Sequence, residues 1–238
     1  MVEKVYMVAK MVGAPVLLLF LSFVLSGCSA FRTPAELTYV SGRMVESLSG
    51  TVSLSYTAPG RSVSGNGYLM YRRPDQLRMV VLSPFGSVLQ EVYLSGKMIT
   101  IIDSGNGIAF SGSFMELPDK GDFSYWRYVY WLIDIDRPDS SRNSAVIQRT
   151  NRFGQQENAT FENGLLVSKT TVEGGDVTYR RFASVQGTAF PLEITYDSKT
   201  KEKCTILLED PEINVPFSDA AFSPDLSKLR VYPLSSLK

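Results

Sequence analysis

The feature that most constrains the fold of this chain is a regular succession of short alternating segments. Between residues 52 and 208, apolar and polar residues alternate repeatedly, and turn-forming residues such as glycine, proline and asparagine separate the segments. Strands joined by such short turns are antiparallel neighbours, because a parallel pair needs a crossover of about a dozen residues or more. We therefore expect a mainly β fold of about eleven strands in one domain.

The clearest hairpin covers residues 76–94, where two apolar segments meet at Ser83, Pro84, Phe85 and Gly86. Proline fixes φ and lacks an N–H donor, and glycine tolerates backbone angles that other residues avoid. These residues therefore predict a turn between antiparallel strands. Phe85 is unusual, because the tip of a turn normally carries a small or polar residue. Its ring either folds back onto the sheet or stays exposed for contact with an apolar partner, and the local sequence leaves both open.

The beginning of the chain has the pattern of a secretion signal. Lys4 and Lys10 precede an apolar run over residues 16–25, and small residues follow it. The run is too short to favour a permanent transmembrane helix. We therefore expect residues 1–27 to be a signal peptide that is removed from the mature protein.

The end of this signal, Leu25-Ser26-Gly27-Cys28, resembles the lipobox of bacterial lipoproteins. That resemblance implies that Cys28 is acylated and becomes the new N-terminus, with residues 28–32 as a tether. The alternative is an ordinary secretion signal with a chance cysteine. Acyl chains contribute about 0.8 kcal/mol per buried methylene, so several chains would anchor the protein firmly.

Two more residues bear on this interpretation, Ser29 and Cys204. Retention at the inner membrane of proteobacteria typically uses aspartate where this chain has Ser29, so the resemblance implies the outer membrane. If Cys28 is acylated, Cys204 has no partner for an intramolecular disulfide. We expect Cys204 to be a small apolar residue on a strand.

A helix is predicted before the first strand. Thr33 and Glu36 have the spacing of a capping box, and a proline occupies the first helical position between them. Leu37, Val40 and Met44 then recur at helical spacing on one face. We expect this N-terminal helix to pack on the sheet.

The alternation is interrupted in the middle of the chain by an aromatic segment. Phe123, Trp126 and Tyr130 have helical spacing, so the segment is either a short helix or an inserted loop. It either fills one end of the sheet as core or contacts a membrane surface, and we favour the core because Asp134 and Asp136 follow at once. These aspartates lack the glycine and the distal glutamate of a calcium loop, so we expect a solvated turn.

Composition argues against most catalytic and nucleic-acid-binding classes. The chain has no histidine, which removes the commonest general base and zinc ligand. Its 24 acidic and 24 basic residues balance, so no basic patch indicates a nucleic acid. No glycine-rich phosphate loop is present. We expect a protein that is not an enzyme and uses no cofactor or metal.

Several of these features together resemble the LolA/LolB superfamily. They are the lipobox, the capped helix, the hairpin, and the segments 191–194 and 210–216 that lead to Phe222. Within the superfamily the chain is most similar to LolB, an outer-membrane lipoprotein receptor. The resemblance implies that residues 33–238 form one domain, an unclosed antiparallel β-barrel with an N-terminal helix and short capping helices. The chain departs from LolB in its aromatic segment, in the acids after it, and in its tail.

The resemblance also implies functional residues. In this family a protruding loop carries an apolar residue implicated in delivery to the membrane, and here that loop is Pro84, Phe85 and Gly86. The acyl chains of the cargo lie in an apolar cavity between the sheet and the helices. The residues expected along that cavity are Leu37, Val40, Met44, Met79, Val81 and Leu89.

The implied function is to accept acylated lipoproteins and insert them into the outer membrane. The implied partners are the lipoproteins or other lipids, a periplasmic LolA-like carrier, and the membrane that holds the anchor of a monomer facing the periplasm. The alternative is an envelope module with the same fold that transfers nothing and binds another lipid or a protein.

Overall fold

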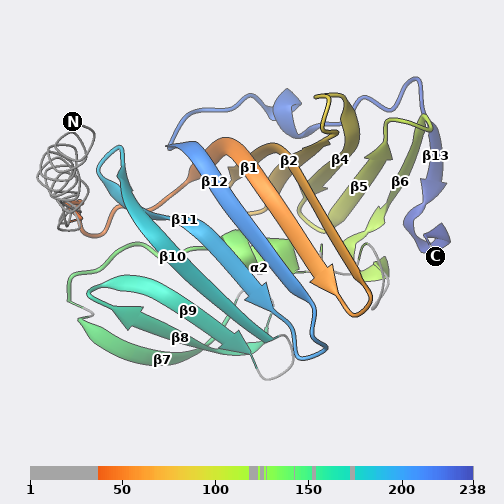
Figure 1. The fold of residues 1–238 in the computed structure, drawn as a ribbon. Coiled ribbons are helices and arrows are strands. Elements are labelled where there is room, and N and C mark those ends of the chain that lie inside the picture. Colours follow the sequence, from red (N-terminus) through yellow and green to blue (C-terminus); the bar gives the residue numbers. More distant parts are fainter. Residues whose placement is uncertain are drawn as a thin grey trace, which may run out of the picture. The chain divides into compact units, whose positions relative to one another are not determined.

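The computed structural model describes residues 37–117, 123, 126, 128–141, 143–151, 154–171 and 175–237. Within these residues the chain forms one sheet of thirteen strands, which curls around helix α2 (Figure 1). The first strands are β1 (Ser47–Ala58), β2 (Arg61–Arg72), β3 (Gln76–Leu82), β4 (Val88–Ser95), β5 (Met98–Asp103) and β6 (Ile108–Ser113). The helical elements that follow are η1 (Phe114–Glu116) and α2 (Val129–Ile133).

The second half of the sheet has the same hairpin character. Its strands are β7 (Ser144–Thr150), β8 (Gln156–Glu162), β9 (Leu165–Thr171), β10 (Gly175–Val185), β11 (Thr188–Asp197), β12 (Lys203–Ile213) and β13 (Arg230–Pro233). The last short helical turns are η3 (Asp219–Phe222) and η4 (Leu234–Ser236).

The strand order confirms the predicted fold class. The order is β13-β6-β5-β4-β3-β2-β1-β12-β11-β10-β9-β8-β7, so β7 and β13 end the sheet and it does not close. Neighbouring strands are antiparallel, except that β13 runs parallel to β6. The structure has thirteen strands instead of about eleven. Strand β13 was not predicted, because it is short and pairs only after the tail returns to β6.

The core lies on the inner face of the curled sheet. Leu69, Met79, Val92 and Ile101 are directly opposite one another on β2, β3, β4 and β5, and all four are buried. Each occupies an alternate position of its strand, which is why one face is continuously apolar. Full burial of such a side chain stabilises the fold by about 1.5–3 kcal/mol.

Helix α2 fills part of this inner face. All five of its residues are buried, and Trp126 is buried just before it. The rings of Trp131 and Tyr196 meet edge to face, with their centres 6.3 Å apart. The ring of Tyr128 stacks on that of Tyr196, with the centres 5.0 Å apart. For the described residues, this confirms the prediction that the aromatic segment is core.

The aspartates after α2 are not a solvated turn, and that prediction was wrong. Asp134 forms an ion pair with Arg73 at 2.8 Å, and Asp136 forms one with Arg149 at 2.7 Å. Arg73 precedes β3 and Arg149 lies on β7. The two ion pairs therefore connect the end of α2 to two separate parts of the sheet.

A buried lysine and a buried glutamate extend this polar cluster. Lys169 donates to the main-chain oxygens of Trp131 and Asp134. Glu157 accepts from the indole N–H of Trp131 at 2.6 Å and from Arg149 at 2.7 Å. Desolvation by burial lowers the pKa of Lys169 to about 8, and the nearby carboxylates oppose that shift.

The predicted N-terminal helix does not form in residues 37–46, which are irregular. The N–H of Val40 donates to Gly187 O at 2.8 Å, and the N–H of Gly42 donates to Pro138 O at 2.6 Å. Gly42 has a φ of 80°, which a right-handed helix does not allow. Long-range main-chain hydrogen bonds therefore replace the local bonds of a helix.

The end of this irregular segment is held by one asparagine. The side chain of Asn214 donates to Met44 O at 3.1 Å and accepts from Glu46 N at 2.8 Å. Val40 is 59% exposed, and Leu37 and Met44 are half-buried. The prediction that these three side chains share the face of a helix was therefore wrong.

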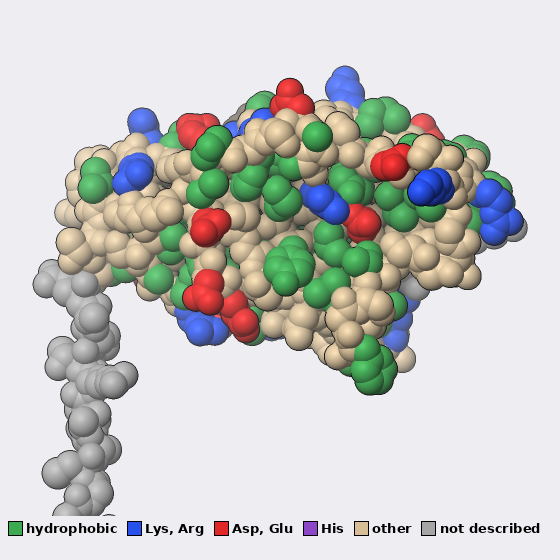
Figure 2. Space-filling model, turned by 90° about the horizontal axis from the view of Figure 1, so that it is seen from above, with side chains coloured by type: hydrophobic (Ala, Val, Ile, Leu, Met, Phe, Trp, Pro, Cys, Tyr) green, Lys and Arg blue, Asp and Glu red, His purple; other side chains and the backbone are tan. Residues whose placement is uncertain are grey.

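The surface carries charges of both signs, in line with the balanced composition. Figure 2 shows a face on which basic and acidic side chains are scattered among hydrophobic ones. In the described part of the chain, we find no helix with the length and hydrophobicity needed to span a membrane. Residues 1–36 lie outside the described residues, so the predicted signal, the acylation of Cys28 and the capping box stay predictions.

Candidate functional site

The turn between β3 and β4 is a compact, hydrogen-bonded loop. The N–H of Ser83 donates to Ser87 O at 2.8 Å, and the N–H of Gly86 donates to Ser83 O at 2.9 Å. The hydroxyl of Ser83 also accepts from the N–H groups of Phe85 and Ser87. Gly86 has a φ of 82°, which explains the glycine. This is the turn that the sequence predicts.

Phe85 projects from this turn into solvent. Its side chain is 97% exposed, so of the two placements that the sequence left open, the exposed one is correct. Three more apolar residues are exposed near the beginnings of β2 and β4, namely Val63, Val88 and Leu89. A fully exposed aromatic ring gains nothing from the fold, and it is available to an apolar partner.

A hollow of about 530 Å³ lies beside this loop. Its wall comes from the ends of β1, β2, β3, β4 and β12, and Ser83 and Pro84 of the loop also line it. This volume is in the range of about 300–1,000 Å³ that is typical of small-molecule sites. The apolar side chains that line the hollow are Leu54, Tyr56, Val63, Val81 and Leu89.

The lining is mixed, because a polar side chain accompanies the apolar ones. Gln90 lies opposite Val81 on the neighbouring strand, so its polar side chain projects from the same face as that of Val81. A ligand with a polar group beside an apolar chain would match both kinds of side chain. The predicted cavity, by contrast, was purely apolar.

Two glycines of β2 shape this region. A Cβ on Gly67 would lie 1.9 Å from Val80 O, so only glycine allows β2 to approach β3 there. A Cβ on Gly65 would lie 3.6 Å from the Cγ1 of Val81, which is an ordinary contact. Gly65 is therefore not required by close packing, and its missing side chain leaves room beside Val81.

The cysteine of the hollow is not a reactive thiol. Cys204 lies opposite Tyr56 and Tyr196 on the neighbouring strands, and it is buried. Desolvation by burial raises the pKa of its thiol to about 12. A thiol in that state is a poor nucleophile. The prediction that Cys204 is a small buried residue on a strand is confirmed.

The structure brings together only part of the predicted site. Val81 and Leu89 line the hollow together with Pro84, whereas Met79 is buried in the core. Leu37, Val40 and Met44 lie on the irregular segment described above. The lining residues that the sequence analysis missed include Leu54, Tyr56 and Val63, and the alternation of β1 and β2 is the signal that would have found them. Among the described residues, no group of three or more histidine, cysteine or acidic side chains could hold a metal ion.

Comparison with solved structures places the fold. A DUF1329 family protein from Desulfovibrio piger superposes with a TM-score of 0.57 at 12% identity, over 76% of this chain and 90% of that protein. A domain from Vibrio parahaemolyticus, proposed to be an outer membrane lipoprotein-sorting protein, gives a TM-score of 0.50 at 6% identity, over 74% of this chain and 89% of that one. The chain shares their fold.

A LolA superfamily protein from Nitrosomonas europaea is also similar, with a TM-score of 0.49 at 11% identity over 76% of this chain and 92% of that protein. The sequence matches no protein-family model and no curated protein sequence. Identities this low show the fold alone. A particular likeness to LolB therefore stays a prediction.

Proposed function

We propose that this protein is a lipid-handling lipoprotein of the cell envelope. The hollow beside the loop accepts acyl chains, and Phe85 brings the loop into contact with the membrane that receives them. The observation that carries the proposal is the placement of Phe85, whose ring is 97% exposed on a hydrogen-bonded turn at the rim of a hollow of about 530 Å³. Neither task needs a catalytic residue.

The energetics of this proposal require no external energy source. Each acyl methylene that leaves water contributes about 0.8 kcal/mol, and a bilayer buries a chain more completely than a hollow with a mixed lining. Chains therefore bind in the hollow and still move downhill into a membrane. Burial of the Phe85 ring in the bilayer adds about 1.5–3 kcal/mol while the loop is inserted.

The proposed cargo is the acyl chains of lipoproteins, received from a periplasmic LolA-like carrier. Acylation of Cys28 would tether the domain to the outer membrane, with the domain facing the periplasm. Such a tether keeps the hollow close to the membrane that accepts the cargo. Similarity in fold to a lipoprotein-sorting domain supports this choice of cargo over other ligands.

The test is the binding of a fluorescent diacylated lipopeptide by the wild type and by Gly65→Leu. The first atoms met by a new Cβ are Val81 Cγ1 at 3.6 Å and Leu82 O at 3.8 Å, so the leucine enters the hollow without a main-chain clash. Excluding about two acyl methylenes costs about 1.6 kcal/mol, which predicts roughly tenfold weaker binding.

The matched control is Gly105→Leu, which adds the same side chain to the β5–β6 turn. There the nearest atom to the new Cβ is Asp103 Oδ1 at 3.5 Å. Urea unfolding of both variants checks that each is folded. Equal lipopeptide binding by Gly65→Leu and the wild type would show that acyl chains do not use this hollow.

A second candidate function is a binding module that holds a different lipid and transfers nothing. The polar side chain of Gln90 in the lining favours it, because this side chain would contact a headgroup and not a chain. Mass spectrometry of protein purified without detergent separates the two candidates. A carrier retains acylated lipoprotein, whereas this module retains a free lipid with a polar head.

A further inference from the structure

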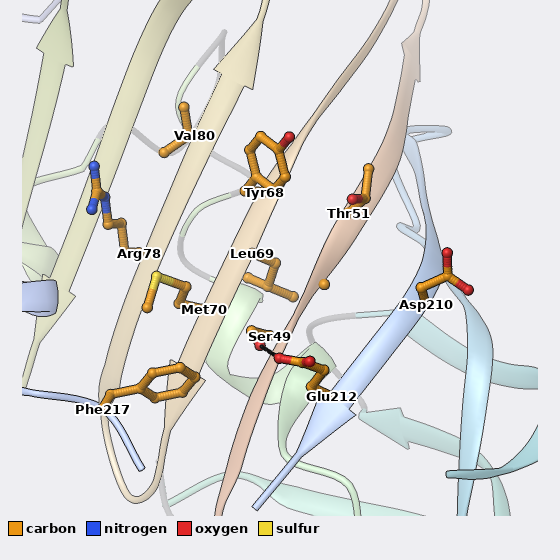
Figure 3. Close-up of a pocket in the computed structure, with 11 residues that line it drawn as sticks. Ser49, Thr51, Tyr68, Leu69, Met70, Arg78, Val80, Asp210, Glu212 and Phe217 are labelled. Atoms are coloured by element: carbon orange, nitrogen blue, oxygen red, sulfur yellow. Dashed lines mark hydrogen bonds between the residues drawn. The ribbon is translucent and has the colours of Figure 1, made fainter. Parts of the chain in front are cut away.

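A second hollow lies on the opposite, outer face of the sheet and is independent of the proposed lipid site. It has a volume of about 450 Å³ and is bounded by β1, β2, β3, β12 and the tail residue Phe217 (Figure 3). We call it the outer groove. The side chains that the argument uses are Tyr68, Met70, Arg78, Asp210, Glu212 and Phe217.

Strand pairing fixes how these side chains lie. Tyr68 and Met70 are two residues apart on β2, so they project from the same face. Across the strands, Met70 lies opposite Arg78 on one side and Ser49 on the other, and Ser49 lies opposite Glu212. The outer groove therefore runs from a basic side, through an apolar middle, to an acidic side.

The basic side of the outer groove is already neutralised. Arg78 forms an ion pair with Glu91 at 2.8 Å, and its guanidinium lies 5.2 Å from the ring centre of Tyr93. An arginine, an aromatic ring and a carboxylate thus form one group with paired charges, although the buried Nε of Arg78 has no hydrogen-bond partner among the described residues. Arg78 has no excess charge to offer a ligand.

A second group of the same kind lies beside the outer groove. The guanidinium of Arg72 is 5.0 Å from the ring centre of Phe222 and 2.5 Å from the carboxylate of Asp219. In both groups, an arginine of the chain supplies the cation that pairs with the aromatic ring and the carboxylate. Such cation–π contacts are worth about 0.5–1 kcal/mol at exposed sites.

The acidic side of the outer groove has the ring and the carboxylates but lacks the cation. Tyr68 is 54% exposed, whereas Phe217 lies on the other side of the groove, beside Met70 (Figure 3). The carboxylate of Asp210 has no hydrogen bond or ion pair with any described residue. The carboxylate of Glu212 accepts one bond of 3.4 Å, from the hydroxyl of Ser49 (Figure 3). Two carboxylates next to exposed apolar side chains are complementary to a cation with an aliphatic stem.

We propose that the outer groove binds an arginine or lysine side chain in a basic segment of a partner protein. The aliphatic stem lies on Tyr68 and Met70, the ring of Tyr68 faces the cation, and Asp210 and Glu212 pair with it. Arginine is preferred over lysine, because its planar head can stack on a ring while it bonds a carboxylate.

The test is fluorescence anisotropy with a labelled decapeptide of alternating alanine and arginine, titrated with the folded domain at about 0.15 M salt. The variant Asp210→Asn with Glu212→Gln removes both charges and keeps the side-chain shapes. Asp210 has a φ of 46°, which asparagine also tolerates. We expect this double variant to bind the peptide about tenfold more weakly, and Tyr68→Ala to bind it about threefold more weakly.

The matched control is Glu162→Gln with Asp176→Asn, which removes two exposed carboxylates on β8 and β10. Its affinity should stay within about twofold of the wild type. Equal weakening by the control, equal binding of an alanine–glutamine peptide, or no saturable binding would each overturn the proposal. Sedimentation of the domain alone distinguishes a second copy: dimerisation that the first double variant abolishes would make the occupant another molecule of this chain and not a partner.

Discussion

Replacement of Phe85 separates membrane delivery from folding, because the structure assigns the ring no role in the fold. The side chain is 97% exposed, so Phe85→Ala and Phe85→Glu should change the free energy of unfolding by less than about 0.5 kcal/mol. In a bilayer the same ring would gain about 1.5–3 kcal/mol by burial. At 1.4 kcal/mol for each factor of ten, alanine should slow delivery by roughly 10- to 150-fold, and glutamate by more.

The assay loads the domain with a fluorescent diacylated lipopeptide and follows its transfer to phosphatidylethanolamine–phosphatidylglycerol vesicles. Phe85 variants should bind the lipopeptide as the wild type does and deliver it slowly. Met115→Glu is the control, since Met115 is an exposed apolar residue on η1 outside the hollow. Transfer at the wild-type rate by Phe85→Glu would refute the argument that the loop inserts. Slow transfer by both Phe85→Glu and Met115→Glu would attribute the effect to charge alone.

Two further predictions concern buried ionisable groups. Burial raises the pKa of the Cys204 thiol from 9.0 to about 12. Between these two values the thiol keeps its proton in the native state and loses it in the unfolded state. The stability that the buried thiol contributes is therefore fully present below pH 9 and falls as the pH rises toward 12. In urea unfolding, the stability of the wild type relative to Cys204→Ala should fall by about 1 kcal/mol between pH 8 and pH 10, and a constant difference would contradict burial of the thiol. Glu157→Gln should destabilise the fold by about 1–3 kcal/mol, because Trp131 and Arg149 lose a charged acceptor, and a loss under about 0.5 kcal/mol in the same assay would mean that water replaces it.

The sheet could be predicted from the sequence because its signals are local. Alternation and turn residues are properties of neighbouring positions, and the turn at Ser83 and Gly86 has the geometry that they indicate. Strand pairs with short turns then follow without further information. Val81 and Leu89, which the family resemblance implied as cavity residues, both flank that turn and line the hollow.

The parts that failed depend on distant partners. Residues 37–46 have a helical pattern, but their main chain bonds to Gly187, Pro138 and Asn214. Asp134 was expected in a solvated turn because no calcium pattern surrounds it, and nothing local indicates its partner Arg73, which lies far away in the sequence, before β3. No spacing rule links such positions, and tertiary contacts override a weak local preference.

The position of helix α2 explains why the hollow lies where it does. Its side chains pack under β11, where Tyr196 meets Trp131, and Glu157 and Lys169 hold its end against β8 and β9. A helix of five residues is only about 7.5 Å long, so it cannot also fill the inner face at the far ends of β1–β4. The open space therefore falls next to the β3–β4 turn, which is also the turn that carries Phe85. The hollow and the exposed ring of Phe85 are therefore close to one another because helix α2 is short. Acyl chains bound in the hollow would reach a membrane by moving only along the β3–β4 loop.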